Sequence, residues 1–221
     1  RLDIINLELS YPTSKGFCYD DYLKVNQDIK FEYLCGVTVD NHFYLDVDAS
    51  GSELVSFHFH TSSTVSFDRI WNIRVQKIMC NTDAEVMRGC GQYYTGTSGR
   101  LLGFNMDGSS SFNYLLHGLN YAVCVRVELG YCKVSYSEIR NAWVPVCPDT
   151  FQRPMSVSAG APQTNKCGSS SVQPSSYEGT YLAPHIFWLD STDSSNTHLS
   201  KSTAPNNYGS YDISYTQTKT C

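Results

Sequence analysis

The residues best suited to chemistry are two histidines that stand two positions apart in the sequence, His58 and His60. In an extended strand this spacing places both imidazoles on one face, where two ring nitrogens could bind one metal ion. No third ligand lies nearby, and the apolar residues Val55, Phe57 and Phe59 alternate with the polar ones. The pattern therefore favours an exposed strand face opposite a buried one, rather than a metal site.

The sequence contains no recognisable motif for a catalytic nucleophile. The nucleophilic serine of many hydrolases stands in Gly-x-Ser-x-Gly, whereas the serine runs at 108–111 and 168–171 are typical of polar loops. The remaining histidines are scattered, and no Cys-x-x-Cys pair with zinc spacing occurs. The sequence predicts no catalytic residue, so we expect a protein that is not an enzyme.

The amino-acid composition excludes several classes of protein and of binding partner. Charged residues make up 17% of the 221 residues, against roughly a quarter in an ordinary soluble chain. The net charge of −5 argues against nucleic acid or an anionic membrane as partner. No apolar run approaches the ~18 residues of a membrane helix. Nine cysteines indicate disulfide bonds, and therefore a secreted, extracellular protein.

Alternation of apolar and polar residues is the main structural signal. It recurs at 42–48, 53–60, 69–77, 121–127 and 134–136, with turn residues between the runs. Two further stretches, 155–180 and 190–209, are rich in serine and read as long loops. The sequence predicts an all-β fold, an antiparallel β-sandwich of many short strands.

The cysteines also reveal an internal repeat. Each copy has a cysteine near an aspartate, a Cys-Gly pair some residues later, and a closing strand that ends in Gln-x-x-x-Cys; the cysteines are Cys18, Cys35 and Cys80 in the first copy and Cys147, Cys167 and Cys221 in the second. The second part has three further cysteines with no counterpart in the first, Cys90, Cys124 and Cys132. We interpret residues 1–82 as a module without its N-terminal half, and 83–221 as a second, complete one.

The motifs of this layout resemble the CUB domain, an extracellular β-sandwich, and most closely the extracellular CUB proteins of arthropods. The resemblance rests on Cys18-x-x-Asp21-x-Leu23, Arg69-x-Trp71-x-Ile73-x-Val75, Gly89-Cys90-Gly91 and the tyrosine- and cysteine-containing segment 120–132. It covers most of residues 1–147. From 148 to 221 the resemblance is weaker and rests only on the cysteines and on the alternation of apolar and polar residues. Cys147-Pro148-Asp149 departs from Cys-x-x-Asp, which leaves that corner of the second module undetermined.

The resemblance implies a pattern of disulfides, namely Cys18–Cys35, Cys90–Cys124 and Cys147–Cys167. Cys132 begins a strand after a turn and Cys221 ends the last strand, so we pair them as an additional bridge. Cys80 is then the odd cysteine.

Cys80 holds the position in the first copy that Cys221 holds in the second. Aligning 133–136 with the start of the chain places the counterpart of Cys132 just before Arg1. We expect Cys80 to bond a cysteine in that missing N-terminal sequence, whether this is cleaved but still attached or simply absent from the chain described. A local Cys80–Cys90 bridge is the alternative, and it would displace Cys124.

Calcium is the one cofactor that the resemblance suggests. Many CUB domains bind Ca²⁺ through acidic residues, one of which is the Asp of Cys-x-x-Asp, and Asp21 matches that position. The segment 60–63, where a later ligand would fall, has no carboxylate. Asp21 as a turn-capping residue is therefore favoured, and we expect no cofactor, with calcium at Asp21 as the weaker alternative. In the second module the acidic residues that could converge are Asp149, Asp190 and Asp193.

The sixteen tyrosines suit either a recognition surface or a sandwich core with hydroxyls at the rim. We expect Tyr121, Tyr136, Tyr211 and Tyr215 in the core, and leave the pair Tyr93–Tyr94 open.

The resemblance implies a function in binding. We expect a secreted, non-enzymatic CUB-type module that binds other extracellular proteins or copies of itself. One alternative is a structural subunit of an extracellular assembly or filament, as in an extracellular matrix. The other is a non-catalytic part of a larger protease precursor.

Overall fold

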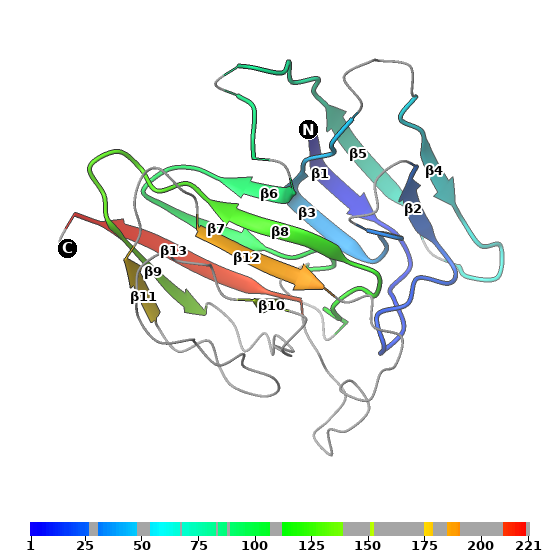
Figure 1. Ribbon diagram of the computed structural model, residues 1–221. Helices are drawn as coiled ribbons and strands as arrows, with labels where there is room; N and C mark the ends of the chain where they lie inside the picture. The colour runs from blue at the N-terminus through cyan, green and yellow to red at the C-terminus, as the bar shows by residue number, and fades with distance from the viewer. Residues whose placement is uncertain are drawn as a thin grey trace.

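Figure 1 shows the computed structural model of the chain, in which the described residues form strands, turns and loops and no helix. The structure describes residues 1–26, 31–47, 54–66, 68–82, 84–87, 89–106, 112–138, 151–152, 175–178, 185–190 and 210–219. The all-β prediction is confirmed.

The strands are short. They are β1 (Leu2–Glu8), β2 (Tyr22–Val25), β3 (Val37–Phe43), β4 (Phe57–His60), β5 (Ile70–Val75), β6 (Cys90–Tyr94), β7 (Ser98–Leu102), β8 (Asn120–Val125), β9 (Lys133–Glu138), β10 (Phe151–Gln152), β11 (Ser175–Glu178), β12 (His185–Asp190) and β13 (Asp212–Thr218). The strands at 37–43, 57–60, 70–75, 120–125 and 133–138 overlap the predicted runs, whereas the strand at 175–178 lies in the stretch 155–180 that is predicted as a loop. The run predicted at 42–48 is a strand only as far as Phe43. Phe43 pairs with Leu2, the first residue of β1, so β3 has no partner in β1 beyond this point. The N–H of the next residue, Tyr44, donates to the carbonyl of Gly91 over 2.7 Å.

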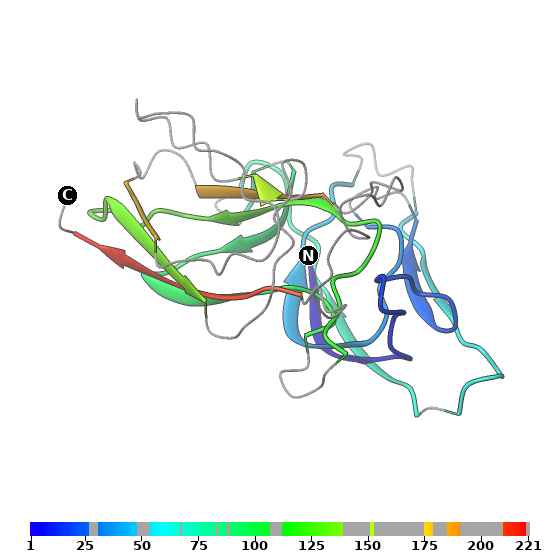
Figure 2. The same cartoon turned by 90° about the horizontal axis from the view of Figure 1, so that it is seen from below.

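Strands β6 to β13 form a sandwich of two four-stranded sheets, in the orders β10-β12-β8-β6 and β11-β9-β13-β7. Figure 2 shows β8 and β12 in one layer and β13 in the other. One pairing departs from the antiparallel expectation, because β6 and β8 run parallel. The intervening strand β7 lies in the opposite sheet, so the chain crosses the sandwich between them and enters β8 in the direction of β6.

The first five strands pair in the same order as the last five. In the first part the sheet β3-β1-β5 stands beside the pair β2-β4; in the second, β11-β9-β13 and β10-β12 repeat both arrangements in chain order. Among the described strands, β6, β7 and β8 have no counterpart in the first part. In the second part, β7 pairs with the outer side of β13 and β8 with the outer side of β12. Their counterparts in the first part, β5 and β4, each have a hydrogen-bonded neighbour on one side only among the described strands.

The two parts share one hydrophobic core, although Figure 1 shows β1 to β5 at one end and the sandwich at the other. The ring of Phe43 meets that of Tyr121 edge to face at 5.2 Å. Gly91 lies between them, and a Cβ there would stand 2.7 Å from both side chains. Only glycine allows this close approach of β6 to β3.

A second contact between the parts depends on Gly36, which adopts a positive φ of 74°. A Cβ at this position would lie 1.9 Å from Oδ1 of Asn105. That oxygen accepts a hydrogen bond from the N–H of Val37 over 3.2 Å, and the N–H of Asn105 donates to Oγ1 of Thr38 over 2.9 Å. The start of β3 is thereby attached to the second part.

Candidate functional site

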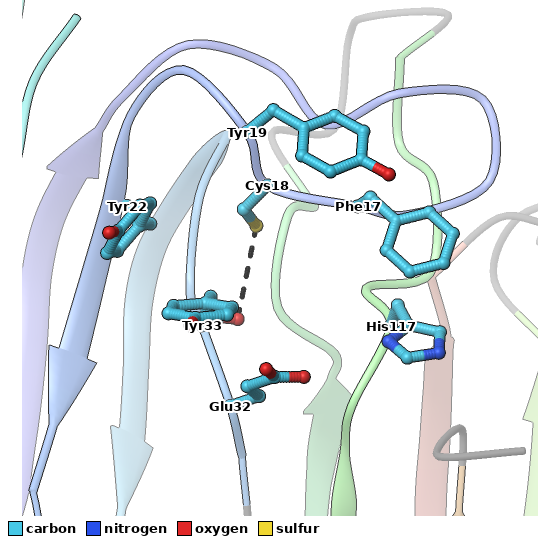
Figure 3. Close-up of a pocket in the computed structure, with 7 residues that line it drawn as sticks. All are labelled: Phe17, Cys18, Tyr19, Tyr22, Glu32, Tyr33 and His117. Atoms are coloured by element: carbon cyan, nitrogen blue, oxygen red, sulfur yellow. Dashed lines mark hydrogen bonds between the residues drawn. The ribbon is translucent and has the colours of Figure 1, made fainter. Parts of the chain in front are cut away.

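A pocket opens beside the Cys18–Cys35 disulfide and encloses about 360 Å³. Figure 3 shows the side chains that line it: Phe17, Cys18, Tyr19, Tyr22, Glu32, Tyr33 and His117. Most of them come from the loop before β2 and from the segment that follows it, while His117 comes from the loop before β8.

Backbone hydrogen bonds hold the walls of the pocket. Leu23 in β2 and Leu34 exchange two bonds of 2.8 and 2.9 Å, which place Tyr22 beside Tyr33. The N–H of His117 donates to the carbonyl of Gly16 over 2.9 Å and fixes the far wall. The disulfide closes the same loops covalently, so the pocket is largely preformed.

Aromatic rings make up both walls. The rings of Tyr22 and Tyr33 lie 4.5 Å apart on one side, and Phe17 stacks on His117 at 4.2 Å on the other. Tyr19 stacks on Phe17 at the rim and is 69% exposed. These rings offer an apolar surface to a ligand.

Glu32 supplies the carboxylate of the pocket. Figure 3 shows its side chain between Tyr33 and His117. Within the described part of the chain, this carboxylate has no hydrogen-bond or ion-pair partner, although the backbone N–H of Glu32 donates to the carbonyl of Gly118 over 3.1 Å. The side chain is solvent-exposed and available to a ligand.

Asp21, the calcium candidate, is fully buried, and both of its carboxylate oxygens are occupied. Arg69 donates to them from Nε and Nη2 over 3.0 and 3.1 Å, and the N–H groups of Ser10 and Ser62 donate over 3.0 and 2.9 Å. Burial alone would raise the pKa of Asp21, but these four hydrogen bonds outweigh it and lower the pKa to about 2.

This donor set does not fit calcium. Ca²⁺ takes six to eight oxygen ligands, whereas the oxygens of Asp21 already face a guanidinium that also binds the carbonyls of Ser62 and Val65 over 2.7 and 3.1 Å. The fixed charge of Arg69 stands where a cation would have to enter. Asp21 therefore ties the start of β2 to the loop after β4, a structural role that differs from the turn cap favoured from the sequence.

The histidine pair of β4 has the predicted geometry and no metal companions among the residues described. His58 and His60 are exposed while Phe57 and Phe59 point inward, and the ring of His60 stacks on Tyr22 at 4.8 Å. No group of three or more metal-ligating side chains occurs within the described ranges. Asp149 and Asp193 lie outside those ranges, and only the backbone of Asp190 is described.

The disulfides agree with the expectations where the structure describes them. Cys18–Cys35 and Cys90–Cys124 are both formed, so the alternative Cys80–Cys90 bridge is wrong. Cys132 is disulfide-bonded, and its predicted partner Cys221 lies outside the described residues, as do both Cys147 and Cys167. Cys80 has an exposed free thiol in this chain, and its bond to an upstream cysteine stays a prediction.

The tyrosines predicted for the core are all buried, as expected; they are Tyr121, Tyr136, Tyr211 and Tyr215. The pair left open packs partly against β3. The ring of Tyr94 meets His42 at 4.8 Å, and the N–H of Tyr93 contacts Nε2 of His42 over 3.1 Å. This pair belongs to the contact between the two parts of the chain and does not form a free recognition surface.

Sequence reasoning missed the pocket and the partner of Asp21. Aromatic residues crowd around Cys18 and Cys35, and that clustering was a usable signal for the pocket. His117 offered no signal, because it stands far along the chain. Arg69 was part of a recognised motif, but nothing in its spacing connected it to Asp21.

In the part of the chain that the structure describes, no helix is long and apolar enough to cross a membrane.

Comparison with known proteins gives one family and several similar solved structures, among them two MASP fragments. A model of the animal CUB domain matches residues 87–198. The CUB1-EGF-CUB2 fragment of human MASP-1/3 is 13% identical with a TM-score of 0.39, over 98% of this chain and 87% of that one. The corresponding fragment of rat MASP-1 is 14% identical with a TM-score of 0.34, over 97% and 86%. No curated protein matches the chain. The family match spans more than half of the sequence and falls on the disulfide-bonded β-sandwich, and on this ground the chain belongs to the animal CUB domain family.

Proposed function

We propose that this chain is a secreted, non-enzymatic module that binds another extracellular protein. CUB domains are typically extracellular modules of protein–protein interaction. The disulfides Cys18–Cys35 and Cys90–Cys124 suit an oxidising compartment. The observation that carries the proposal is the aromatic pocket, whose rim residue Tyr19 is 69% exposed on a corner held by a disulfide.

Rigid, exposed aromatic side chains are well suited to protein binding. Tyrosine brings a large contact area at a small cost in conformational entropy, and aromatic residues are enriched among the residues that dominate binding energy. Because Tyr19 and Phe17 already stack at 5.7 Å, little ordering is required when a partner arrives.

The test uses the full chain, immobilised and exposed to extracellular fluid from its source. Any protein retained is purified, and its Kd for the chain is measured. We expect Tyr19→Ser to weaken this binding at least tenfold, with Leu129→Ser, another exposed apolar residue, as the matched control. Absence of a saturable partner, or equal effects of both variants, would contradict the proposal.

We further propose that residues 1–82 and 83–221 are copies of one module, and that another polypeptide segment completes the first. The repeated pairing order of β1–β5 and β9–β13 supports this. Among the described strands, none pairs with β5 on the side where β7 pairs with β13 in the second part, and the β5 side chains of Ile70, Trp71 and Val75 are exposed. Open, apolar edge strands are usually covered in native proteins. The exposed thiol of Cys80, just beyond β5, could bond this segment covalently.

A second copy of the chain could cover the same edge, which corresponds to a structural subunit of an assembly. Light scattering on the purified full chain separates the two cases. A monomer at high concentration argues for a separate segment, and concentration-dependent oligomers argue for self-association.

A further inference from the structure

The last strand of the first part, β5, has an open side. Its sheet has the order β3-β1-β5, so among the described strands only β1 pairs with it. Figure 1 shows β1 and β3 on the same side of β5. The corresponding strand of the second part, β13, pairs with β9 on one side and with β7 on the other. The two closing strands therefore differ by one neighbour.

The backbone of β5 directs hydrogen-bonding groups to this open side. Gln76 and Arg1 exchange two hydrogen bonds, of 2.8 and 2.7 Å. In an antiparallel pair, hydrogen-bonded and non-hydrogen-bonded residue pairs alternate along the strands. Val75, which stands opposite Leu2, therefore points its N–H and carbonyl groups away from β1. Ile73, two positions earlier, has the same orientation, so the edge offers the backbone groups of both residues to an incoming strand.

The same side of β5 also has uncovered apolar side chains. Residues that stand opposite each other in antiparallel strands share one face of the sheet. The partners of Trp71, Ile73 and Val75 in β1 are buried in the core; they are Leu7, Ile4 and Leu2. Trp71 is nevertheless 48% exposed and Val75 61%. Side chains that face the core thus stand uncovered beside an open backbone edge.

Strand β4 repeats this situation in the neighbouring sheet. Leu23 in β2 exchanges backbone hydrogen bonds of 2.8 and 2.9 Å with Leu34, on the side away from β4. Its partner Phe59 therefore directs its own backbone groups away from β2. The ring of Phe59 stacks on that of Trp71 at 4.6 Å. This stack joins two strands that each have an open edge among the described strands.

The second part of the chain shows what fills this position. Gln217 in β13 stands opposite the buried Val134, as Val75 stands opposite Leu2. Its N–H donates to the carbonyl of Thr97, just before β7, over 2.7 Å, and β7 runs antiparallel to β13. The core-facing residues of β13 are at most 4% exposed; they are Ile213, Tyr215 and Gln217. An antiparallel strand therefore both satisfies the backbone and covers the side chains on this side.

We infer that β5 accepts a β-strand of another polypeptide segment, antiparallel to β5 and with apolar side chains at alternate positions that face Trp71, Ile73 and Val75. Extended peptides bind to open sheet edges in this way, with affinity from main-chain hydrogen bonds and specificity from alternate side chains. The inference rests on the proposed completion of the first part. It assigns to the completing segment a direction, a set of hydrogen bonds and a side-chain pattern.

The test titrates the full chain, labelled with ¹⁵N, with blocked synthetic peptides and follows amide resonances by NMR. One peptide alternates valine and threonine between a terminal lysine and a terminal glutamate, and the other has the same composition with the valines and threonines in two blocks. We expect the alternating peptide to shift resonances of residues 57–60 and 70–76. It should bind at least about tenfold more tightly than the block peptide, because only alternation presents a continuous apolar face to β5.

Methylation of the peptide backbone tests the hydrogen bonds. If the valines face the core, their N–H groups point to β5 and those of the threonines point away. N-methylation of the valines should therefore weaken binding about tenfold, whereas N-methylation of the threonines should leave the Kd within about twofold. A nitroxide at the N-terminus of the peptide should broaden the resonance of Val75 more than that of Ile70, since the strands run antiparallel.

Matched variants of β5 locate the site. Val75→Lys directs a charge towards the incoming strand, as native proteins do to protect open edges, and should weaken binding of the alternating peptide about tenfold. Ile70→Lys adds the same charge to an exposed residue on the opposite face of β5 and should leave the Kd within about twofold. Dispersed spectra verify that both variants fold. No saturable binding, equal binding of the alternating and block peptides, or equal effects of the two variants would overturn the inference.

The inference and the proposed function fail separately. If the alternating peptide does not bind while Tyr19→Ser weakens binding of an extracellular partner, the rim site is real and β5 accepts no strand. If the peptide binds and no extracellular partner is found, the strand site is real and the proposed function at the rim is wrong. If the chain is an oligomer in which residues 70–76 are already protected from hydrogen exchange, a second copy covers the edge and the inference of a separate segment is wrong.

Discussion

Gln92 donates a hydrogen bond from Nε2 to Oδ1 of Asn41 over 2.6 Å and so joins the second part of the chain to the first. The hydroxyl of Tyr211 donates to Oε1 of Gln92 and lies 2.9 Å from the hydroxyl of Tyr121. Both amide groups also donate to the carbonyl of Leu102. All four side chains are at most 5% exposed, so each lost bond leaves a buried polar group without water.

This network predicts that the two parts unfold together. Gln92→Leu should lower the free energy of unfolding by about 2–3 kcal/mol, because it removes the buried hydrogen bonds that Gln92 makes with Asn41, Tyr211 and the carbonyl of Leu102. Urea denaturation measures the loss. The exposed Ser137→Ala serves as control and should change stability by less than about 0.5 kcal/mol.

A double-mutant cycle with Asn41→Leu sharpens this prediction. We expect a coupling energy of about 1–2 kcal/mol between Asn41 and Gln92, and one unfolding transition for the whole chain. Strictly additive effects, or two separate transitions, would show that the parts are independent.

The pair Asp21–Arg69 predicts stability that does not depend on calcium. Because Arg69 occupies the carboxylate, millimolar Ca²⁺ should leave the Tm of the full chain unchanged in calorimetry. Arg69→Met should cost about 3 kcal/mol, since it leaves Asp21 buried without its partner.

Arg126→Met is the matched control for this change. Arg126 pairs with Glu128 at the surface, over 2.9 Å, and its loss should cost less than about 1 kcal/mol. A rise in Tm of the unmodified chain with Ca²⁺, reversed by a chelator, would contradict the assignment of Asp21.

The burial of His42 predicts that the free energy of unfolding depends on pH in a range higher than that in which the carboxylates titrate. Burial first, and then the positive charge of Arg1, lower the pKa of His42 to about 4, against ~6.5 in an unfolded chain. Between these values the unfolded chain binds more protons, so stability is complete above pH ~6.5 and falls as the pH drops towards 4. The expected loss is on the order of 3 kcal/mol.

Urea denaturation between pH 4 and 7 measures this slope. His42→Gln should remove most of it, whereas His58→Gln, an exposed residue of β4, should leave it intact. Asp21 does not contribute to this slope. Because its pKa is lowered to about 2 in the folded chain, the stability that it provides is lost only below pH ~3.9, the pKa of an unfolded aspartate. An unchanged slope in His42→Gln would assign the effect to another group.

Cys80 predicts a specific cross-link in the protein isolated from its source. A non-reducing peptide map should show the Cys80 peptide bonded to a peptide from outside residues 1–221, and the Cys132 peptide bonded to Cys221. The Cys18–Cys35 peptide is the internal control, because that bridge is present in the structure. Cys80 recovered as a free thiol, or bonded within the chain, would rule out a covalently attached segment.

Much of the fold could be read from local pattern. Alternation along 53–60 placed Phe57 and Phe59 inward and His58 and His60 outward, and β4 has this arrangement. The core positions of Tyr121 and Tyr215 followed in the same way. Strand periodicity can be read without the tertiary structure, because successive side chains point to opposite faces of any strand.

The sequence by itself determined the all-β class, the family resemblance and two of the disulfides, because these depend on periodicity and on cysteine spacing within a known pattern. Only the tertiary structure decided that Arg69 neutralises Asp21, that His117 closes a pocket begun at Phe17, and that Gln92 reaches Asn41. Each of these contacts joins residues far apart in the chain. Their formation depends on how sheets pack and which buried charges find partners, a property of the whole fold that no local window contains.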